Sequence, residues 1–145
     1  MSQIGIRVVI DCGFYGLSHW VHHMEGLVSD LTHRVSLMNV YGPYKDRVQF
    51  WSGAEEAGCL RLDSLILGGE LNFTLNAREV WGKKASLDTQ PDFFQSLFEE
   101  AGLVDIASLT LTPTWRNGRS VSAGFSKRLD RFYLYDHFLE GSLQS

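Results

Sequence analysis

The sequence predicts a layered α/β fold, and three observations support this prediction. Short apolar runs rich in β-branched residues alternate with segments whose apolar residues recur at helical spacing. The chain has 145 residues, which is the size of one domain. Its content of 44% hydrophobic and 12% aromatic residues is ample for a globular core.

Three strands are predicted in the first part of the chain. Residues 4–10 are apolar and β-branched, which is typical of a strand. Residues 19–28 are ambiguous between helix and strand, and we favour a strand. Residues 34–41 are rich in Val, Leu and Met, and Gly42 with Pro43 is expected to stop this strand.

Two helices are predicted. Within residues 45–57, apolar side chains recur every three positions, and Gly58 is a plausible end. Residues 92–101 form the clearest helix, with Pro91 in the first turn, Asp88 or Thr89 as the cap and Gly102 at the end. The predicted buried positions are Val48, Trp51, Ala54 and Ala57 in the first helix, and Phe93, Phe94, Leu97, Phe98 and Ala101 in the second.

The remaining strands are short. Residues 64–67 form a continuous apolar run, which favours a buried strand. Residues 104–106 and 129–134 are further strands, and residues 117–124 form a polar loop with two glycines.

Composition narrows the function classes. The formal net charge of −4 argues against a strongly basic nucleic-acid-binding surface. Cys12 and Cys59 are far apart without metal-ligand spacing, and we interpret them as reduced intracellular thiols rather than a disulfide. No apolar stretch approaches the roughly 20 residues needed to span a bilayer, and the start lacks the features of a secretory signal. We therefore expect an intracellular protein; nothing in the sequence separates nucleus from cytoplasm.

Histidines cluster near the N-terminus, at positions 19, 22, 23 and 33. Zinc needs three or four convergent ligands, and no Cys or acidic residue stands at motif spacing nearby. We expect dispersed surface histidines here rather than a metal site.

The most informative motif is Gly68-Gly69-Glu70-Leu71-Asn72, which follows the apolar run 65–67. If the chain stays extended, Glu70 and Asn72 point to the same side, because side chains alternate along a strand. Oxygen-bearing groups of this kind suit Mg²⁺, and two glycines allow a sharp turn or the close approach of a substrate. A solvated turn would explain the same residues without any chemistry.

Two further motifs strengthen the case for a site. Residues 40–43 read Val-Tyr-Gly-Pro at the end of an apolar run, and residues 126–132 read Ser-Lys-Arg-Leu-Asp-Arg-Phe. In combination and order, residues 34–132 resemble the endonuclease/exonuclease/phosphatase superfamily, and most closely its plant branch related to non-LTR retrotransposon endonucleases. The resemblance implies a two-sheet α/β sandwich, of which this chain supplies part.

The resemblance also implies roles for single residues. Glu70 takes the place of the family's base or metal-binding Asp, and Asn72 that of the Asn that fixes a phosphate oxygen. Tyr41 would contact the phosphate, and Asp130 would orient a catalytic His. Mg²⁺ is the implied cofactor, with Glu70 as its ligand, and nucleic acid is the implied partner.

Each of these residues also has a simpler explanation. Tyr41 would pack at a strand end with its hydroxyl in water. Asp130 would form an ion pair with Arg128 or Arg131. Trp115, with Arg116 and Asn117, could stack on a base or sugar as a substrate-binding group, or Trp115 could be a core residue beside a polar turn.

The chain departs from the family pattern in ways that affect the functional prediction. Glu70 is one methylene longer than the family's Asp, and Leu71 replaces a Phe. The family's first Asn, its metal-binding Glu and its terminal Ser-Asp-His are not found, and Asp136-His137 follows Asp130 too closely to replace them. We therefore expect an incomplete, degenerate metal-dependent phosphodiesterase. The alternative is a catalytically inactive retroelement-derived fragment, with no chemistry or with a protein-interaction role.

The expected domain organisation follows from the same alignment of motifs. Residues 1–33 form an unassigned segment that supplies strands of the same domain, 34–135 the nuclease-like part and 136–145 a tail. A single sheet without its partner sheet leaves alternate residues of 34–41 and 64–67 uncovered. Exposed apolar sheet faces favour association, so we expect self-association through this face.

Overall fold

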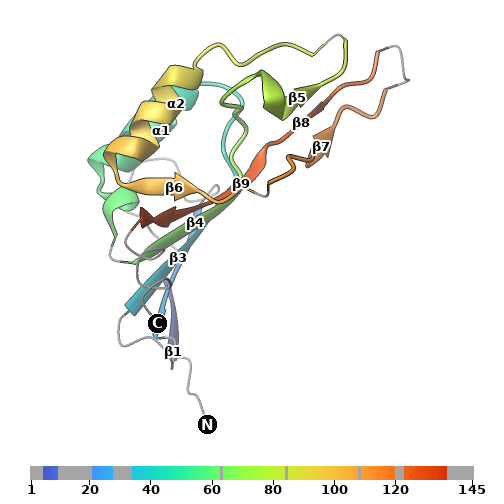
Figure 1. Cartoon of the computed structure of the whole chain (residues 1–145). Coiled ribbons are helices and arrows are strands. Elements are labelled where there is room, and N and C mark those ends of the chain that lie inside the picture. The colour runs from blue at the N-terminus through green and yellow to red at the C-terminus, as the bar shows by residue number, and fades with distance from the viewer. Residues whose placement is uncertain are drawn as a thin grey trace.

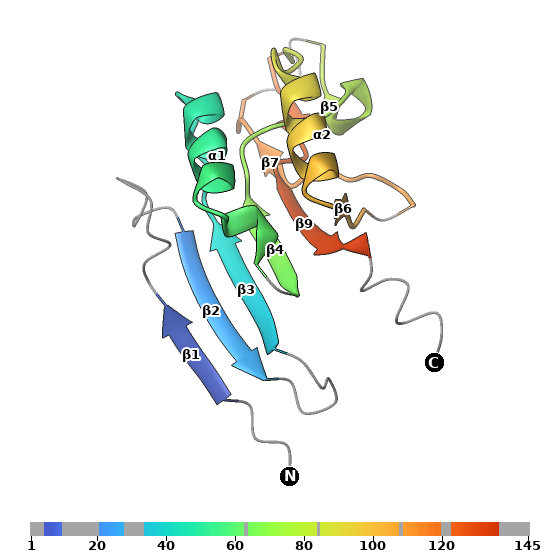
Figure 2. The same ribbon diagram turned by 90° about the vertical axis from the view of Figure 1, so that its left-hand side faces the viewer.

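A six-stranded mixed sheet organises the chain (Figures 1 and 2). The structure is a computed structural model and describes residues 5–9, 21–27, 34–62, 64–83, 85–107, 109–119 and 123–136. The strand order is β1-β2-β3-β4-β9-β6. The strands are β1 (Gly5–Val9), β2 (Val21–Leu27), β3 (Arg34–Val40), β4 (Leu65–Glu70), β6 (Leu103–Asp105) and β9 (Asp130–Tyr135).

The five pairings of neighbouring strands in this order differ in direction. The pairs β1–β2, β2–β3, β4–β9 and β6–β9 are antiparallel, whereas β3–β4 is parallel. Parallel neighbours need a crossover connection. Helix α1 (Arg47–Glu56) and the 3₁₀ turn at Cys59–Arg61 supply it. As a result β3 and β4 end at the same edge of the sheet, where β9 begins.

The predicted strands and helices are confirmed where the chain is described, with small shifts at their ends. Helix α2 (Pro91–Glu100) has Pro91 in its first turn, as expected, but Gln90 occupies the N-cap position without a side-chain cap bond. In α1, Trp51 and Ala54 are buried as predicted, whereas Ala57 is exposed and Phe50 is buried instead. The buried face of α1 therefore differs from the predicted face. The packing of the aromatic pair Phe50 and Trp51 sets the orientation of the helix.

Both helices cover the same face of the sheet (Figure 1). Their aromatic side chains stack on rings of the sheet and of the segment after β4: the rings of Phe98 and Tyr133 are 4.0 Å apart and nearly parallel, and those of Phe94 and Phe73 are 4.2 Å apart. Burial of such rings dominates the stabilisation of a core. The buried core contains Met38, Val40, Phe50, Trp51, Ala54, Cys59, Leu60, Leu65, Leu67, Leu71, Phe73, Phe94, Leu97, Phe98, Ala101, Leu103 and Tyr133.

The opposite face of the sheet is exposed on its described strands. Leu37 of β3 is 38% exposed and Phe132 of β9 is 58% exposed, and together with Ile66 they line a shallow hollow of about 220 Å³. Leu37 and Ile66 belong to the alternating residues of 34–41 and 64–67 that were predicted to form an uncovered face.

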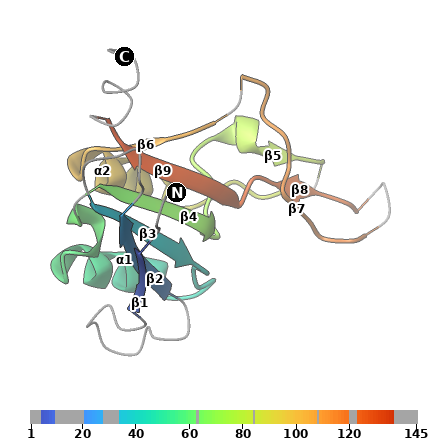
Figure 3. The same cartoon turned by 90° about the horizontal axis from the view of Figure 1, so that it is seen from below.

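A small second sheet, in the order β5-β8-β7, lies beyond the end of the large one (Figure 3). Its strands are β5 (Val80–Trp81), β7 (Trp115–Arg116) and β8 (Ser126–Lys127). The sequence did not predict these strands, because two-residue strands carry no periodicity. Together the two sheets and the helices form an α/β sandwich architecture. Across the part of the chain that is described, neither helix is long and apolar enough to cross a membrane.

The Gly68-Gly69 pair lies inside β4 and does not end it. A Cβ atom at Gly68 would meet the Phe132 ring at 2.2 Å, and one at Gly69 would meet the Val40 carbonyl oxygen at 2.2 Å. Gly69 also has φ of 130°, which side chains rarely tolerate. The expectation of a sharp turn at this pair is wrong, because the two glycines make room for neighbouring strands.

Candidate functional site

Three of the predicted site residues meet at one end of the sheet. Tyr41 directly follows β3, Glu70 is the last residue of β4, and Asp130 is the first residue of β9. Glu70 and Asp130 are direct cross-strand partners. Side chains of directly opposed residues lie on the same face of a sheet, so the two carboxylates share the face that carries Leu37 and Phe132.

Backbone hydrogen bonds hold these strand ends together. The amide of Gly42 donates to the carbonyl oxygen of Glu70 at 2.8 Å, and the amide of Leu71 donates to that of Leu129 at 2.8 Å. A Cβ atom at Gly42 would meet the Leu71 carbonyl oxygen at 2.3 Å, so this position needs a glycine for the close approach. The Gly-Pro that follows Tyr41 therefore fixes where the tyrosine stands relative to Glu70.

Two tyrosines and Glu70 form a short chain of hydrogen bonds. Burial raises the pKa of Glu70, as does the negative charge of Asp130, while the hydrogen bond from Tyr41 opposes both effects. The hydrogen bond between Tyr44 and Tyr41 raises the pKa of Tyr44 to about 12, with smaller contributions from burial and from the charges of Tyr41 and Glu70. A bond that raises a phenol pKa is one that the phenol donates. The order of donation is therefore Tyr44 to Tyr41 to Glu70.

Asn72 lies beside this group but not as an extended strand would place it. Its φ is 61°, so the chain has left the extended conformation and the predicted alternation with Glu70 is wrong. The side chain is only 5% exposed, and Nδ2 donates to the carbonyl oxygen of Gly42. Among the residues that the structure describes, no group bonds to Asn72 Oδ1. The Asn72 side chain thus links the end of β4 to the end of β3, and its Oδ1 has no hydrogen-bond partner among the described residues.

Arg47 and Asp88 clamp the segment that carries Asn72. Arg47 donates to both carboxylate oxygens of Asp88, at 2.6 and 2.9 Å, and to the carbonyl oxygen of Asn72 at 3.2 Å. Burial would raise the pKa of Asp88, but hydrogen bonds from Arg47 and from the amides of Gln90 and Thr74 outweigh it and lower the pKa. Asp88, which the sequence nominated as a helix cap, instead joins α1 to the residues after β4.

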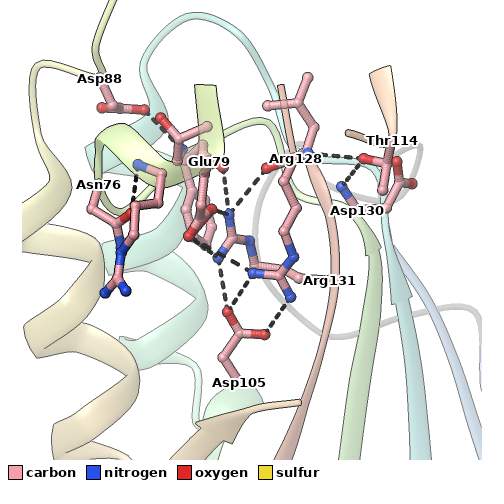
Figure 4. Close-up of polar contacts among 12 residues, drawn as sticks. Asn76, Glu79, Asp88, Asp105, Thr114, Arg128, Asp130 and Arg131 are labelled. Atoms are coloured by element: carbon pink, nitrogen blue, oxygen red, sulfur yellow. Dashed lines mark hydrogen bonds and ion pairs between the residues drawn. The ribbon is translucent and has the colours of Figure 1, made fainter. Parts of the chain in front are cut away.

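Thr114 positions the start of β9 and was not predicted as a site residue. Its Oγ1 accepts hydrogen bonds from the amides of Leu129 and Asp130, both at 3.0 Å (Figure 4). A single threonine within Pro-Thr-Trp-Arg offers no periodic signal, so only the fold identifies it. In the described residues, the Asp130 carboxylate itself makes no ion pair.

The arginines on either side of Asp130 pair with other acids (Figure 4). Arg131 is fully buried and donates to Glu79 at 2.5 Å, Asp105 at 2.9 Å and the Phe73 carbonyl oxygen at 3.0 Å. Arg128 makes two bonds to Asp105, at 2.8 and 2.9 Å. The hydrogen bonds of Asp105 raise the pKa of Arg128 despite its burial. An ion pair of Asp130 with Arg128 or Arg131 is therefore not what the structure has, because both cations point to the helix-covered side.

The structure separates Trp115 from Arg116 and Asn117. Trp115 lines a pocket beside Asn72, whereas Arg116 and Asn117 line a different, shallower hollow on the small sheet. Asn117 bonds within its own hairpin: Nδ2 donates to the Ala123 carbonyl oxygen, and Oδ1 accepts from the amides of Phe125 and Arg119. Its side chain therefore shapes the hairpin.

If the chain binds a divalent cation, Glu70 and Asp130 are the carboxylates at the strand ends that would hold it. Mg²⁺ prefers oxygen ligands, keeps several waters and needs only one or two carboxylates. The pair supplies these two carboxylates, and burial together with the negative charge of Asp130 raises the pKa of Glu70. Within the described ranges, no group of three or more His, Cys, Asp or Glu residues lies together as a metal cluster.

Some predicted residues lie outside the described ranges. This applies to Cys12, His19, His33 and His137, and for His22 and His23 the structure describes only the backbone of β2. The structure therefore tests neither the histidine cluster as a zinc site nor Asp136-His137 as a substitute for the family's terminal motif.

Comparison with solved structures shows which known fold this chain shares. The chain is similar to the endonuclease domain of TRAS1, a telomere-specific non-LTR retrotransposon, with a TM-score of 0.69 and 15% sequence identity. The match covers 94% of this chain and 58% of the TRAS1 chain, so this chain spans little more than half of that domain's length. No protein-family model matches the sequence, and no curated protein matches it. At this identity the likeness shows a shared fold.

Proposed function

We propose that this chain is an endonuclease-like domain of retroelement origin that binds a phosphodiester group of nucleic acid at the end of β4 and β9. The observation that carries the proposal is the cross-strand pair Glu70–Asp130 with the Tyr41 hydroxyl bonded to Glu70. Two carboxylates and a phenol at a strand end can hold a hydrated Mg²⁺ and a phosphate oxygen. The TRAS1-like fold supports the choice of nucleic acid over a small phosphoester.

Each side chain has a role in this proposal. Glu70 and Asp130 would hold the cation, which when bound would supply charge stabilisation to the phosphate. Tyr41 orients the Glu70 carboxylate and faces the phosphate. Asn72 fixes the ends of β3 and β4 and retains an unused acceptor.

We propose further that turnover is slow or absent. Glu70 stands where the family that the chain resembles carries the shorter Asp, which displaces the carboxylate by about one carbon–carbon bond. A misplacement of about 1 Å can lower a catalytic rate by about 10²-fold. Binding of a phosphate tolerates such a shift better than catalysis does, because catalysis depends on the transition-state geometry.

The test compares cleavage and binding in one set of variants. Labelled single- and double-stranded DNA is incubated with the native chain, Glu70→Asp and Asp130→Asn in the presence of Mg²⁺ or Mn²⁺. We expect native binding that depends on the cation and weakens in Asp130→Asn, with cleavage at background. Glu70→Asp should show the most cleavage. Cation-independent binding that Asp130→Asn leaves unchanged would refute the proposal, and rapid cleavage by the native chain would refute the slow turnover.

A protein-interaction role is the second candidate, and the exposed apolar face favours it. Leu37 and Phe132 are exposed beside the hollow on the uncovered side of the sheet.

A further inference from the structure

Strand β6 lies at one edge of the large sheet, and part of its backbone faces away from the sheet (Figure 2). The amide of Ile106 donates to the carbonyl oxygen of Phe132, which fixes the hydrogen-bonded positions of the β6–β9 pair. Bonded and unbonded positions alternate in an antiparallel pair, so the N–H and C=O groups of Leu103 and Asp105 point outward. Within the described ranges, no backbone group pairs with them. The edge therefore offers two donors and two acceptors to an added strand.

A pocket of about 240 Å³ lies beside this edge, between β6 and α2. Leu103 and Asp105 line it from the strand, and side chains at helical spacing line it from α2. Directly opposed residues of two paired strands place their side chains on the same face. A side chain of an added strand that lies opposite Leu103 or Asp105 would therefore point to the pocket. The lining residues are Leu75, Gln95, Phe98, Glu99, Leu103, Val104, Asp105 and Tyr133.

The pocket is small and largely apolar, with one unbalanced negative charge. Its volume is below the roughly 300 Å³ at which pockets for whole small molecules begin, so it suits a single apolar side chain. The charge of Asp105 is balanced, because this carboxylate bonds to Arg128 and Arg131.

Glu99 supplies the unbalanced charge. It is exposed, and its carboxylate accepts a hydrogen bond at 2.7 Å from the neutral amide of Gln95. In the part of the chain that the structure describes, no Lys or Arg pairs with Glu99. A basic side chain on the occupant would complement this charge.

A second copy of this chain is a poor occupant of the edge. Antiparallel pairing of two β6 strands would bring α2 of both copies to the same side of the joined sheets, each helix carrying Glu99. Like charges that face each other across paired strands are destabilising. In addition, β6 has only three residues, so the edge can bind a short segment but offers little to a whole sheet.

We propose that the outer edge of β6 binds an extended peptide of another protein, paired antiparallel to the strand. The peptide places an apolar side chain in the pocket and a Lys or Arg two positions away beside Glu99, because alternate residues of a strand share a face. Addition of a strand to a sheet edge, with a pocket that selects alternate side chains, is a recurring mode of peptide recognition. The peptide site is independent of the phosphodiester site, since it uses none of the side chains of that site.

The first experiment measures binding of a labelled peptide, Gly-Thr-Lys-Thr-Leu-Thr-Lys-Thr-Gly, by fluorescence anisotropy at physiological salt. Its Leu and both Lys share one face when the peptide is extended. Three controls change one feature each: Ser in place of Leu, Glu in place of both Lys, and N-methylation of the Leu and Lys amides, which would face β6. We expect each control to bind about tenfold more weakly or worse, because each loses apolar burial, charge complementarity or backbone pairing. Equal binding of the four peptides overturns the proposal.

A matched pair of variants tests the charge. Glu99→Lys reverses the charge at the pocket, whereas Glu100→Lys makes the same change at the next residue, which is exposed and does not line the pocket. We expect the Leu-Lys peptide to bind about tenfold more weakly to Glu99→Lys and to stay within about twofold of native for Glu100→Lys. Equal losses in the two variants would show a general charge effect and would overturn the site.

Amide hydrogen exchange locates the pairing. Exchange of the Asp105 amide should slow when the peptide saturates the chain, whereas the Val104 amide, which already faces β9, should change little. A bound peptide that leaves Asp105 exchange unchanged overturns strand addition. Slowing at Asp105 that follows the concentration of the chain itself, without peptide, would identify a second copy as the occupant and overturn the peptide proposal.

Discussion

Glu70 and Asp130 stand directly opposite each other on β4 and β9, at the end of the sheet where Tyr41 also lies. Two acidic side chains in this relationship repel each other, and like charges directly opposite destabilise an antiparallel pair. The pKa of Glu70 is raised by burial first and by Asp130 second. A pair that costs stability in this way is a common mark of a binding site.

The first prediction concerns the pH dependence of stability. Because the folded-state pKa of Glu70 lies above its ordinary value of 4.5, the folded chain binds this proton more tightly than the unfolded chain does. Its contribution to the free energy of unfolding therefore decreases as pH rises from the unfolded pKa through the folded one. Glu70→Gln removes this penalty, so the variant should gain stability relative to the native chain as the pH rises above the ordinary Glu pKa of 4.5.

Urea unfolding of both proteins across this pH range measures the effect. Asp130→Asn serves as the matched control, because it removes only the charge that raises the pKa of Glu70 and should give a smaller change of the same sign. A difference between native chain and Glu70→Gln that does not vary with pH would contradict the shifted pKa.

The second prediction concerns Thr114. Replacement by Val keeps the shape but removes the acceptor of the Leu129 and Asp130 amides. The Leu129 bond is part-buried and the Asp130 bond is exposed, so Thr114→Val should lose about 0.5–1.5 kcal/mol, the net contribution of an ordinary hydrogen bond, and loosen the start of β9. Amide hydrogen exchange should accelerate at residues 129 and 130, and Thr114→Ser, which keeps the hydroxyl, should remain close to native. Unchanged exchange at both amides would show that Thr114 does not hold them.

The third prediction concerns the buried arginine. The Arg131 side chain is fully buried and that of Glu79 is 3% exposed, so Arg131→Met removes the nearer cation of Glu79 and leaves this buried carboxylate with Arg128, 3.7 Å away. Breaking such a pair costs about 3–5 kcal/mol. Urea unfolding should show this loss, whereas Arg78→Met, at an exposed position, should stay within about 0.5 kcal/mol of native. A loss below about 1 kcal/mol in Arg131→Met would mean that water reaches Glu79.

The sequence predicted most of the large sheet and both helices, because these elements carry periodic apolar patterns. It also nominated Glu70, Asp130 and Tyr41, but each from a separate motif. Their meeting depends on the pairing of β4 with β9, which lie 60 positions apart at Glu70 and Asp130. Register between distant strands follows from the whole hydrophobic pattern and is not visible in a local motif.

Other differences between the predictions and the structure have local causes. In β9, Arg131 and Tyr133 are buried while Asp130 and Phe132 are exposed, so the period-two alternation places Arg131 on the face away from Asp130. This alternation excludes an ion pair between Asp130 and Arg131, because their side chains lie on opposite faces of the sheet. The two-residue strands and Thr114 left no comparable signal, because their contacts come from distant parts of the chain.

The fourth prediction concerns the uncovered face of the sheet. Leu37 and Phe132 present apolar surface there around a hollow lined by Ile66 and Gly68. Contiguous exposed apolar surface on a soluble chain marks an association site. We propose that the chain self-associates through this face, so it should bind an apolar-surface dye and sediment faster as its concentration rises. The double variant Leu37→Ser and Phe132→Ser should bind less dye and shift toward the monomer, whereas Leu109→Ser, which removes an exposed apolar side chain from a loop, should not. A native chain that stays monomeric at high concentration and binds no dye would contradict both the exposed face and the protein-interaction role of that face.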